Sequence, residues 1–301
     1  MRVLDWYNHQ GHQYEFFKLG YKFTLLGIGE VKPDWNEKTR PKHKNVREVS
    51  IDEIVDESFD VVMYRTGGRK KWIESYVKRG AKAIAVVQTT TPPDIPKYVK
   101  HVVWNSIVTM NKYKNYFKHA KHFYIPHGFD PNEFLNQNLD RNGNLLTVAN
   151  VFKPRGNLLG YSDWVKVNNA VGCKLVGHGN KDISSDMMEA ETFQDLLGEY
   201  NKNSIYLNTT IESAMPRSRG EAMMCGMALI TTNNYDISRY VSHKKNAFLC
   251  NNHKDMIKYA MLLKEDKELC IEMGLAARAA AIKYFNIKEY LERWNDLFCK
   301  L

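Results

Sequence analysis

The sequence has no long apolar run. Its uninterrupted apolar stretches, such as Ile84–Val87, are far shorter than the roughly 18 residues that a membrane-spanning helix needs. The first 25 residues mix charged, polar and aromatic side chains, so no signal peptide is expected. These absences predict a cytoplasmic protein, with peripheral attachment to a membrane surface as the alternative.

Cysteine is scarce. The five cysteines form no CxxC pair and all lie in the second half of the chain. This pattern favours reduced thiols over a disulfide framework, and we expect each cysteine to be a small apolar residue of the core. No HExxH or comparable ligand spacing indicates a metal site.

Acidic residues are fewer than basic ones. The 301 residues include 34 Asp and Glu against 43 Lys and Arg, which gives a net charge of +9. Residues 1–140 hold 22 of the basic and 16 of the acidic side chains, so the excess is larger there. This excess suits an anionic partner, although a lysine-rich genome would produce it with no function attached. The apolar share of 44% is normal for a globular chain of two domains.

Short β-like runs alternate with helical patterns along the first half of the chain. Strands are expected at Arg2–Trp6, Lys22–Leu26, Asp60–Tyr64, Ala83–Gln88 and Val102–Trp104, and helices at Tyr14–Leu19 and Lys71–Arg79. Such alternation predicts βαβ units with a mostly parallel sheet. We therefore predict a doubly wound, Rossmann-like α/β domain over residues 1–135.

The segment DPNEFLNQNLDRNGN, from Asp130, is the best candidate for a linker. After it, strands are expected at Leu145–Ala149, Lys174–Val176, Ile205–Leu207, Ala228–Thr231 and Ala247–Leu249, and helices at Met256–Lys264 and Lys267–Tyr284. The apolar spacing in KEYLERWNDLF predicts an amphipathic terminal helix. We predict a second Rossmann-like domain over residues 136–282 and a C-terminal helix within residues 283–301.

The stretch PRSRGEAMMCGMALITT, residues 216–232, follows the predicted strand Ile205–Leu207. Ligands of parallel sheets bind beyond the carboxyl ends of strands. Ser218 and Glu221 have the spacing of a capping box, so we expect a helix to start near Ser218. The alternative is a core helix in which Glu221 serves only the cap.

A helix start at this place suits a phosphate group. Its free N–H donors and partial positive charge attract anions, and Arg217 and Arg219 would add forked donors. Glu221 beside it would accept hydrogen bonds from two neighbouring hydroxyls, such as those of a ribose. The stretch therefore predicts a nucleotide site.

Several segments resemble GT-B glycosyltransferases of the family 4 type. GEAMMCGMALITT resembles their EAMxCGxPVI segment, with Glu221 at the ribose-binding glutamate. IPHGFDPNEF, residues 125–134, resembles the NGVDxxxF segment that ends their first domain. LLTVANVFKPRG, followed by KLVGHGN, resembles their VGRxxxxKG and IVGxG pair, and FNIKEYLERWNDLF resembles their last helix, which returns to the first domain. The first half of the chain matches this family only in its order of elements, a strand followed by the loop NHQGHQ and a helix.

The resemblance implies a GT-B fold and a retaining, hexosyltransferase-type enzyme. The second domain would bind a nucleoside diphosphate sugar, with a UDP-sugar as the expected donor, and the first would bind the acceptor. Such enzymes commonly need no metal, and the sequence has no DxD pair. Neither a cofactor nor an obligate protein partner is implied. The expected donor contacts are Gly11, Asn150, Lys153, Arg155, Gly177, Arg217, Ser218, Arg219 and Glu221.

The sequence departs from the family pattern at several places, and two of them concern the donor site. The first of the family's paired glutamates falls on Ser213, and the nearest carboxylate is Glu212. The family's Arg/Lys pair falls on Asn150 and Arg155, so Lys153 would supply the second charge on the leaving diphosphate. Retention without an enzymic nucleophile implies front-face attack by the acceptor. The expected catalytic residues are Glu212, Arg155, Lys153 and His12.

The expected acceptor is a hydroxyl of a glycan or lipid-linked saccharide. Its expected contacts are His127, Arg65, Arg69, Lys70 and Lys71. A second candidate acceptor is a hydroxymethylated base of viral DNA, because the basic residues are interleaved with aromatic ones. The chain could also be a sugar- or nucleic-acid-binding protein that kept the fold without turnover, which Ser213 suggests, or a nucleotide-sugar epimerase.

Overall fold

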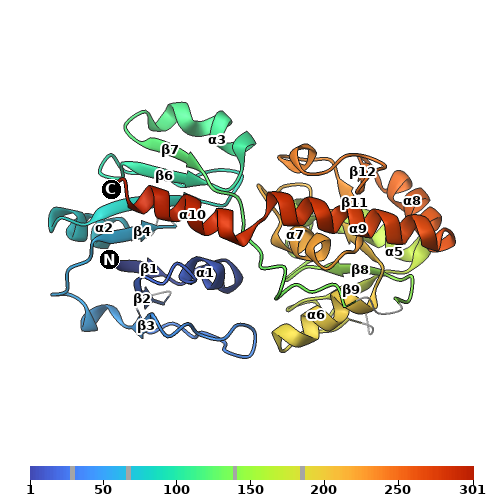
Figure 1. The fold of residues 1–301 in the computed structure, drawn as a ribbon, viewed down its shortest axis with the longest axis horizontal. Coiled ribbons are helices and arrows are strands. Elements are labelled where there is room, and N and C mark those ends of the chain that lie inside the picture. Colours follow the sequence, from blue (N-terminus) through green and yellow to red (C-terminus); the bar gives the residue numbers. More distant parts are fainter. Residues whose placement is uncertain (28–30, 66–68, 138–140, 184–186) are drawn as a thin grey trace. The chain divides into compact units, whose positions relative to one another are not determined.

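The computed structural model divides the chain into two compact units (Figure 1). Unit 1 comprises Met1–Gly128 and Ile287–Leu301, and unit 2 comprises Phe129–Asn286. The division lies after Gly128, seven residues before the expected end of the first domain. The described residues are 1–27, 31–65, 69–137, 141–183 and 187–301, so residues 138–140 of the expected linker lie outside them.

Unit 1 holds a sheet in the order β3-β2-β1-β4-β5-β6-β7, in which all neighbours are parallel. Its strands are β1 Arg2–Trp6, β2 Lys22–Leu26, β3 Val46–Val49, β4 Val61–Tyr64, β5 Lys82–Val87, β6 His101–Trp104 and β7 Lys121–Tyr124. The five expected strands are present, with each end within one residue of the prediction. The two edge strands, β3 and β7, were not predicted. Both are short, carry charged residues and are partly exposed, so they lack the apolar run of a central strand.

Both faces of this sheet are buried. Successive residues of a strand point to opposite faces, and Val3 and Leu4 accordingly belong to different apolar clusters. Helix α1, Gln10–Phe17, packs in the cluster of Val3, and α2, Lys70–Lys78, packs in that of Leu4. Among the described residues before the linker, further helical segments are α3 Ile107–Tyr113, η2 Ile51–Glu53 and η4 Lys114–Phe117.

The last helix, α10 (Ile287–Phe298), belongs to unit 1. Tyr290 and Trp294 lie one helical turn apart and are buried, and the Trp294 ring centroid lies 4.7 Å from that of Phe16 in α1. A Cβ at Gly128 would lie 2.6 Å from the Cβ of Tyr290, so this position requires glycine. Helix α10 thus completes the apolar layer on the α1 face of the sheet.

Unit 2 holds a second parallel sheet in the order β12-β11-β10-β8-β9. Its strands are β8 Leu145–Val148, β9 Lys174–Val176, β10 Ile205–Asn208, β11 Ala228–Thr232 and β12 Phe248–Cys250. They match the five expected strands to within one residue at each end. The helices are α4 Gly156–Leu159, α5 Tyr161–Val171, α6 Phe193–Lys202, α7 Arg217–Met224, α8 His253–Glu265 and α9 Lys267–Tyr284, with η5 at Ile237–Arg239. The predicted doubly wound α/β architecture is confirmed.

Each sheet has one point where the order of its strands reverses. In unit 1, β1 lies between β2 and β4, and in unit 2, β8 lies between β9 and β10. Loops that leave the carboxyl ends of strands at such a point diverge to opposite faces and leave room for a ligand. The loops after β1 and β4, and those after β8 and β10, are therefore the places where a site is expected.

The cysteines only partly meet the expectation of core burial. Cys225, Cys250 and Cys270 are buried, Cys173 is partly buried, and Cys299 is exposed. Burial raises the pKa of the Cys225 and Cys250 thiols to about 12. The predicted core role was wrong for Cys299, which lies in the turn after α10 and has no apolar layer over it.

Two arginines bind the C-terminal end of α7. Arg278 donates to the carbonyl oxygen of Met224 and, at 2.8 Å, to that of Phe134. Arg141 donates to the carbonyl oxygen of Gly226 at 3.1 Å. Cations at this end satisfy carbonyl groups that have no partner within the helix and complement the helix dipole. These bonds fix the end of α7 to helix α9, which carries Arg278, and to the segment before β8, which carries Arg141.

Helix α7 approaches Phe129 closely at Gly220. A Cβ at Gly220 would lie 2.4 Å from Cε2 of Phe129. The Phe129 ring is buried between those of Phe134 and Phe285, at centroid distances of 5.6 and 5.8 Å, so it has no room to move aside. The position therefore requires glycine although it is helical.

Gly220→Ala is expected to lower the free energy of unfolding by about 1–3 kcal/mol, because the added methyl group would overpack this contact. Gly198→Ala is the matched control, since nothing lies within 4 Å of a Cβ added at this glycine of α6. It is expected to raise the same free energy by about 0.5–1 kcal/mol through helix propensity. Chemical denaturation measures both changes, and equal stability of the two variants would contradict the close approach of α7 to Phe129.

Candidate functional site

The loops after β8 and β9 are joined by Asn180, which is fully buried. Its Nδ2 donates to the carbonyl oxygens of Ala149 at 2.7 Å and Gly177 at 2.9 Å, and its Oδ1 accepts from the N–H of Phe152 at 2.7 Å. A Cβ at Gly177, which has a φ of 145°, would lie 2.1 Å from the Ala149 oxygen. The predicted site residue Gly177 thus allows the two loops to meet. Asn180 was not predicted, because a single loop asparagine carries no signal in the sequence.

Val151 has a φ of 51°, a conformation that is costly for a β-branched residue. Its N–H donates to the carbonyl oxygen of His178 at 2.7 Å, and Oδ1 of Asn150 accepts from the N–H of His178 at 3.0 Å. These bonds hold the loop after β8 in its strained conformation. Strain of this kind often marks a functional site.

The predicted cations Lys153 and Arg155 lie on this same loop, and both are exposed. Nζ of Lys153 lies 3.3 Å from Oδ2 of Asp182, an exposed pair that contributes little to stability. Nη1 of Arg155 donates to the carbonyl oxygen of Asn150 at 3.4 Å. The structure therefore brings Asn150, Lys153 and Arg155 together and leaves two cations accessible to an anion.

Helix α7 starts near the predicted place, but its cap differs from the prediction. The helix begins at Arg217, and its N-cap is Pro216, which makes no side-chain cap. The capping box predicted at Ser218 was therefore wrong. Ser218 lies within the first turn of α7 rather than at its cap, and Glu221 is bound by Tyr200 and Arg217.

Glu221 is a buried carboxylate, 7% exposed, that is held by two donors. The hydroxyl of Tyr200 donates to its Oε2 at 3.1 Å. Nε and Nη2 of Arg217 donate to its Oε1 at 3.3 and 3.2 Å, and the Arg217 guanidinium lies 4.8 Å from the centroid of the Phe129 ring. Tyr200, which comes from the preceding helix α6, was not among the predicted site residues. Glu221 therefore has a fixed orientation that a helix cap does not explain.

Arg219 is directed into unit 2 and is 1% exposed. Its Nη2 donates to Oδ1 of Asn208 and of Asn234, both at 3.1 Å, and its Nη1 donates to the hydroxyl of Tyr240 at 3.3 Å. Asn208 ends β10, and Asn234 lies in the segment after β11. Arg219 thus joins the segments that follow β10 and β11, whereas Arg217, whose side chain is 9% exposed, binds Glu221.

Glu212 is exposed on the loop between β10 and α7. Its N–H and that of Ile211 donate to the carbonyl oxygen of Leu158 at 2.9 Å, which ties this loop to α4. Gly160, with a φ of 72°, permits the approach, because a Cβ there would lie 2.0 Å from the carbonyl oxygen of Thr209. The loops after β8, β9 and β10 and the start of α7 therefore form one connected group.

The predicted acceptor residue Arg65 is buried in unit 1. Its Nε and Nη2 donate to Oδ1 and Oδ2 of Asp5, both at 2.8 Å, and the two side chains are 1% and 0% exposed. Nε2 of Gln13 also donates to Oδ2 of Asp5, at 2.9 Å. This network lies where the strand order of unit 1 reverses, and it fixes the end of β1 to the end of β4.

Gly11 and His12 lie in the first turn of α1 rather than in a loop. The His12 ring is buried, and its centroid lies 5.4 Å from that of His127. Nη1 of Arg65 lies 3.5 Å from Nδ1 of His12. The structure thus brings together His12, His127 and Arg65 of the predicted set.

The other predicted basic residues lie at the start of α2. The guanidinium of Arg69 lies 6.0 Å from the Trp6 ring centroid, Lys70 pairs with Asp94, and Lys71 is exposed. They follow Arg65 closely in the chain but differ from it in being at least partly accessible. Unit 1 therefore has one buried and three accessible cations at this place.

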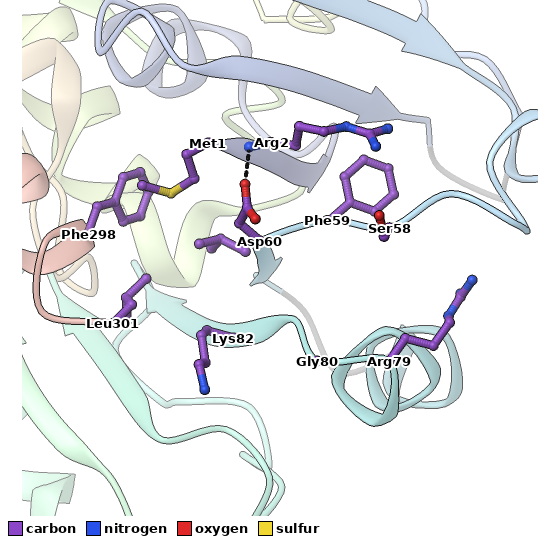
Figure 2. Close-up of a pocket in the computed structure, with 11 residues that line it drawn as sticks. Met1, Arg2, Ser58, Phe59, Asp60, Arg79, Gly80, Lys82, Phe298 and Leu301 are labelled. Carbon is purple, nitrogen blue, oxygen red and sulfur yellow. Dashed lines mark hydrogen bonds between the residues drawn. The ribbon is translucent and has the colours of Figure 1, made fainter.

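Unit 1 has a hollow of about 550 Å³, and Figure 2 draws the residues that line it. It is lined by Arg2, Val61 and Lys82, which begin β1, β4 and β5, and by Phe298 of α10. The dashed line marks the bond from the N–H of Arg2 to Oδ2 of Asp60, at 2.7 Å. The hollow therefore lies at the amino ends of the strands, and none of the predicted site residues lines it.

Within the described ranges, no group of three His, Cys, Asp or Glu side chains is arranged to hold a metal ion. Within the same ranges, no helix combines the length and the apolar character needed to cross a membrane.

Residues 193–280 match the family model described as Glycosyl transferases group 1. This segment includes Tyr200, Arg217 and Glu221. No curated protein sequence matches the chain significantly.

Solved structures of glycosyltransferases resemble the chain. HepE from Anabaena, in complex with UDP and glucose, has a TM-score of 0.75 and 14% identity, with 100% of each chain covered. Sucrose-phosphate synthase from Thermosynechococcus elongatus has a TM-score of 0.77 and 10% identity. The match covers 100% of this chain and 98% of the synthase chain. TarM from S. aureus has a TM-score of 0.63 and 17% identity over 79% of this chain, which spans 54% of TarM. These similarities show the fold: the predicted GT-B fold is confirmed.

The Asp5–Arg65 pair allows a test of the network in unit 1. Asp5→Ala is expected to lower the free energy of unfolding by about 3–5 kcal/mol, because it leaves the Arg65 charge buried without its partner. Asp94→Ala, which breaks the exposed pair with Lys70, should leave that free energy almost unchanged. Denaturant titration measures both. Similar small effects of the two variants would show that Arg65 is not a buried structural cation.

Proposed function

We propose that the chain is a retaining, hexosyltransferase-type enzyme that moves a sugar from a UDP-sugar to an acceptor hydroxyl. The observation that supports this best is the buried, oriented carboxylate of Glu221, which lies beside the start of α7 in the segment that matches the glycosyl transferases group 1. HepE was solved with UDP-glucose, which supports a UDP-sugar as the donor.

Unit 2 would bind the donor at the loops after β8 and β10. Glu221 would accept hydrogen bonds from ribose hydroxyls. Lys153 and Arg155, which are exposed on the loop after β8, would neutralise the diphosphate, and the N–H groups at the start of α7 would add donors for the same anion. Arg219 would support this site from below, because its guanidinium is already bound within unit 2.

Transfer would break the bond between the anomeric carbon and the diphosphate oxygen. Negative charge then develops on the departing diphosphate, and the cations of Lys153 and Arg155 would stabilise it. The acceptor oxygen would attack from the same face while the departing phosphate takes its proton, so the configuration is retained. In this scheme the positive charge comes from side chains, and no metal ion takes part. Glu212, the exposed carboxylate of the next loop, would orient the sugar.

Unit 1 would bind the acceptor, a glycan or a lipid-linked saccharide. TarM was solved with fondaparinux, alpha-GlcNAc-glycerol and UDP, which supports a saccharide acceptor. His12 and His127 would contact sugar hydroxyls, and the accessible cations at the start of α2 suit an anionic acceptor or an anionic membrane surface. Arg65 would act indirectly, by holding the end of β1 through Asp5.

A nucleotide panel tests the donor site. UDP is expected to raise the melting temperature of the wild type more than GDP, ADP or CMP, because a ligand at a hundred times its dissociation constant stabilises the folded state by about 2.7 kcal/mol. Arg155→Ala/Glu221→Ala should lose this shift, whereas Lys258→Ala/Glu272→Ala, which changes two exposed charges on α8 and α9, should keep it. No shift of the wild type with any nucleotide would contradict the proposal.

Turnover separates transfer from binding alone. With UDP-glucose and saccharide acceptors, the wild type is expected to form a glycosylated product, and Glu221→Ala is expected to lose it. Nucleotide binding without a product would indicate a binding protein, and a product only with hydroxymethylated DNA would indicate a DNA-modifying enzyme. Release of an altered free sugar would indicate an epimerase.

A further inference from the structure

Both carboxylate oxygens of Glu221 are bound by side chains of unit 2. Oε2 accepts a hydrogen bond from Tyr200, and Oε1 accepts two from the guanidinium of Arg217. Hydrogen bonds to an ionised group are stronger than neutral ones and hold the group in one orientation. The carboxylate therefore has little freedom to rotate.

Tyr200 can act only as a donor in this pair. Its side chain is fully buried, and burial together with the Glu221 charge raises the pKa of the Tyr200 hydroxyl well above its ordinary value. The hydroxyl keeps its proton and donates it to a carboxylate oxygen, which has none to offer. Helix α6 begins with a capping box of Thr192 and Asp195, and it places the Tyr200 ring in the buried apolar cluster of unit 2.

One acceptor position of Glu221 is left for a ligand on the Tyr200 side. A carboxylate oxygen has two lone-pair sites, and Tyr200 occupies one of those on Oε2. The side chain of Glu221 is 9% exposed, so protein atoms do not close it off completely. A fixed, partly buried acceptor discriminates strongly between a ligand that has the matching hydroxyl and one that lacks it, because the acceptor is then left unsatisfied.

We infer that Tyr200 is a positioning residue that gives the site its selectivity for ribonucleotides, by fixing Oε2 of Glu221 where it accepts a ribose hydroxyl. This inference rests on the proposed function of unit 2. Tyr200 itself does not touch the nucleotide. Tyr200 therefore raises the affinity only for ligands that carry the ribose hydroxyls.

The test compares UDP with 2′,3′-dideoxy-UDP by calorimetric titration. The wild type is expected to bind UDP at least about tenfold more tightly, as a lost hydrogen bond to a charged group predicts. Tyr200→Phe should weaken UDP binding about three- to tenfold and leave the affinity for the dideoxy nucleotide unchanged. The ratio of the two dissociation constants should therefore fall by the same factor.

Tyr206→Phe is the matched control. The Tyr206 ring is also fully buried and lies 6.1 Å from that of Tyr200, but its hydroxyl donates to the carbonyl oxygen of Val148. This variant should keep the wild-type ratio. If Tyr200→Phe is too unstable to measure, Glu221→Gln provides the second variant, since loss of the charge should reduce the same ratio.

The outcomes separate this inference from the proposed function. If the wild type binds another nucleotide of the panel, the same comparison is made with that nucleotide and its dideoxy analogue. A wild type that binds none overturns the proposed function and the inference together. Binding by the wild type with a ratio that Tyr200→Phe leaves unchanged overturns the inference alone, and so does a ratio that Glu221→Gln leaves unchanged. Equal weakening of both nucleotides by Tyr200→Phe also overturns it, because that result would show a merely structural role.

Discussion

The candidate site of unit 2 depends on how helix α7 is held. Arg278 and Arg141 bind the carbonyl groups at and after its C-terminal end, and Gly220 lets the helix lie against Phe129. A helix fixed at one end and along one side presents its other end in a defined place. The carboxylate of Glu221, one turn after the start of α7, therefore has a rigid support within unit 2.

Each unit contains a buried polar network near the point where its strand order reverses. In unit 1 the network is the Asp5–Arg65 pair, and in unit 2 it is Arg219 with Asn208. Buried charges are costly unless they are paired, so these side chains are committed to protein partners. Their contribution is to fix the loops. The groups that remain accessible on the same loops, Arg155 among them, are the ones suited to a ligand.

At the start of α7, the sequence left open the direction in which the side chains point. Ser218 and Glu221 have the spacing of a capping box, but Pro216 occupies the N-cap and Glu221 binds other partners. Arg217 and Arg219 are two positions apart, and a helix directs such residues to different sides. Arg217 therefore binds Glu221 and Arg219 binds Asn208, and the spacing of the two arginines in the sequence does not show which one does which.

The sequence by itself determined the alternation of strands and helices and the central strands of both sheets, because apolar runs and their spacing are local properties. It also determined that Glu221, Lys153 and Arg155 follow the carboxyl ends of strands, and a resemblance over short segments identified the fold. Only the tertiary structure decided the partners: Tyr200 beside Glu221, Asp5 beside Arg65, and Asn180 between two loops. The first two of these contacts join residues 21 and 60 positions apart, and packing rather than local pattern brings such residues together.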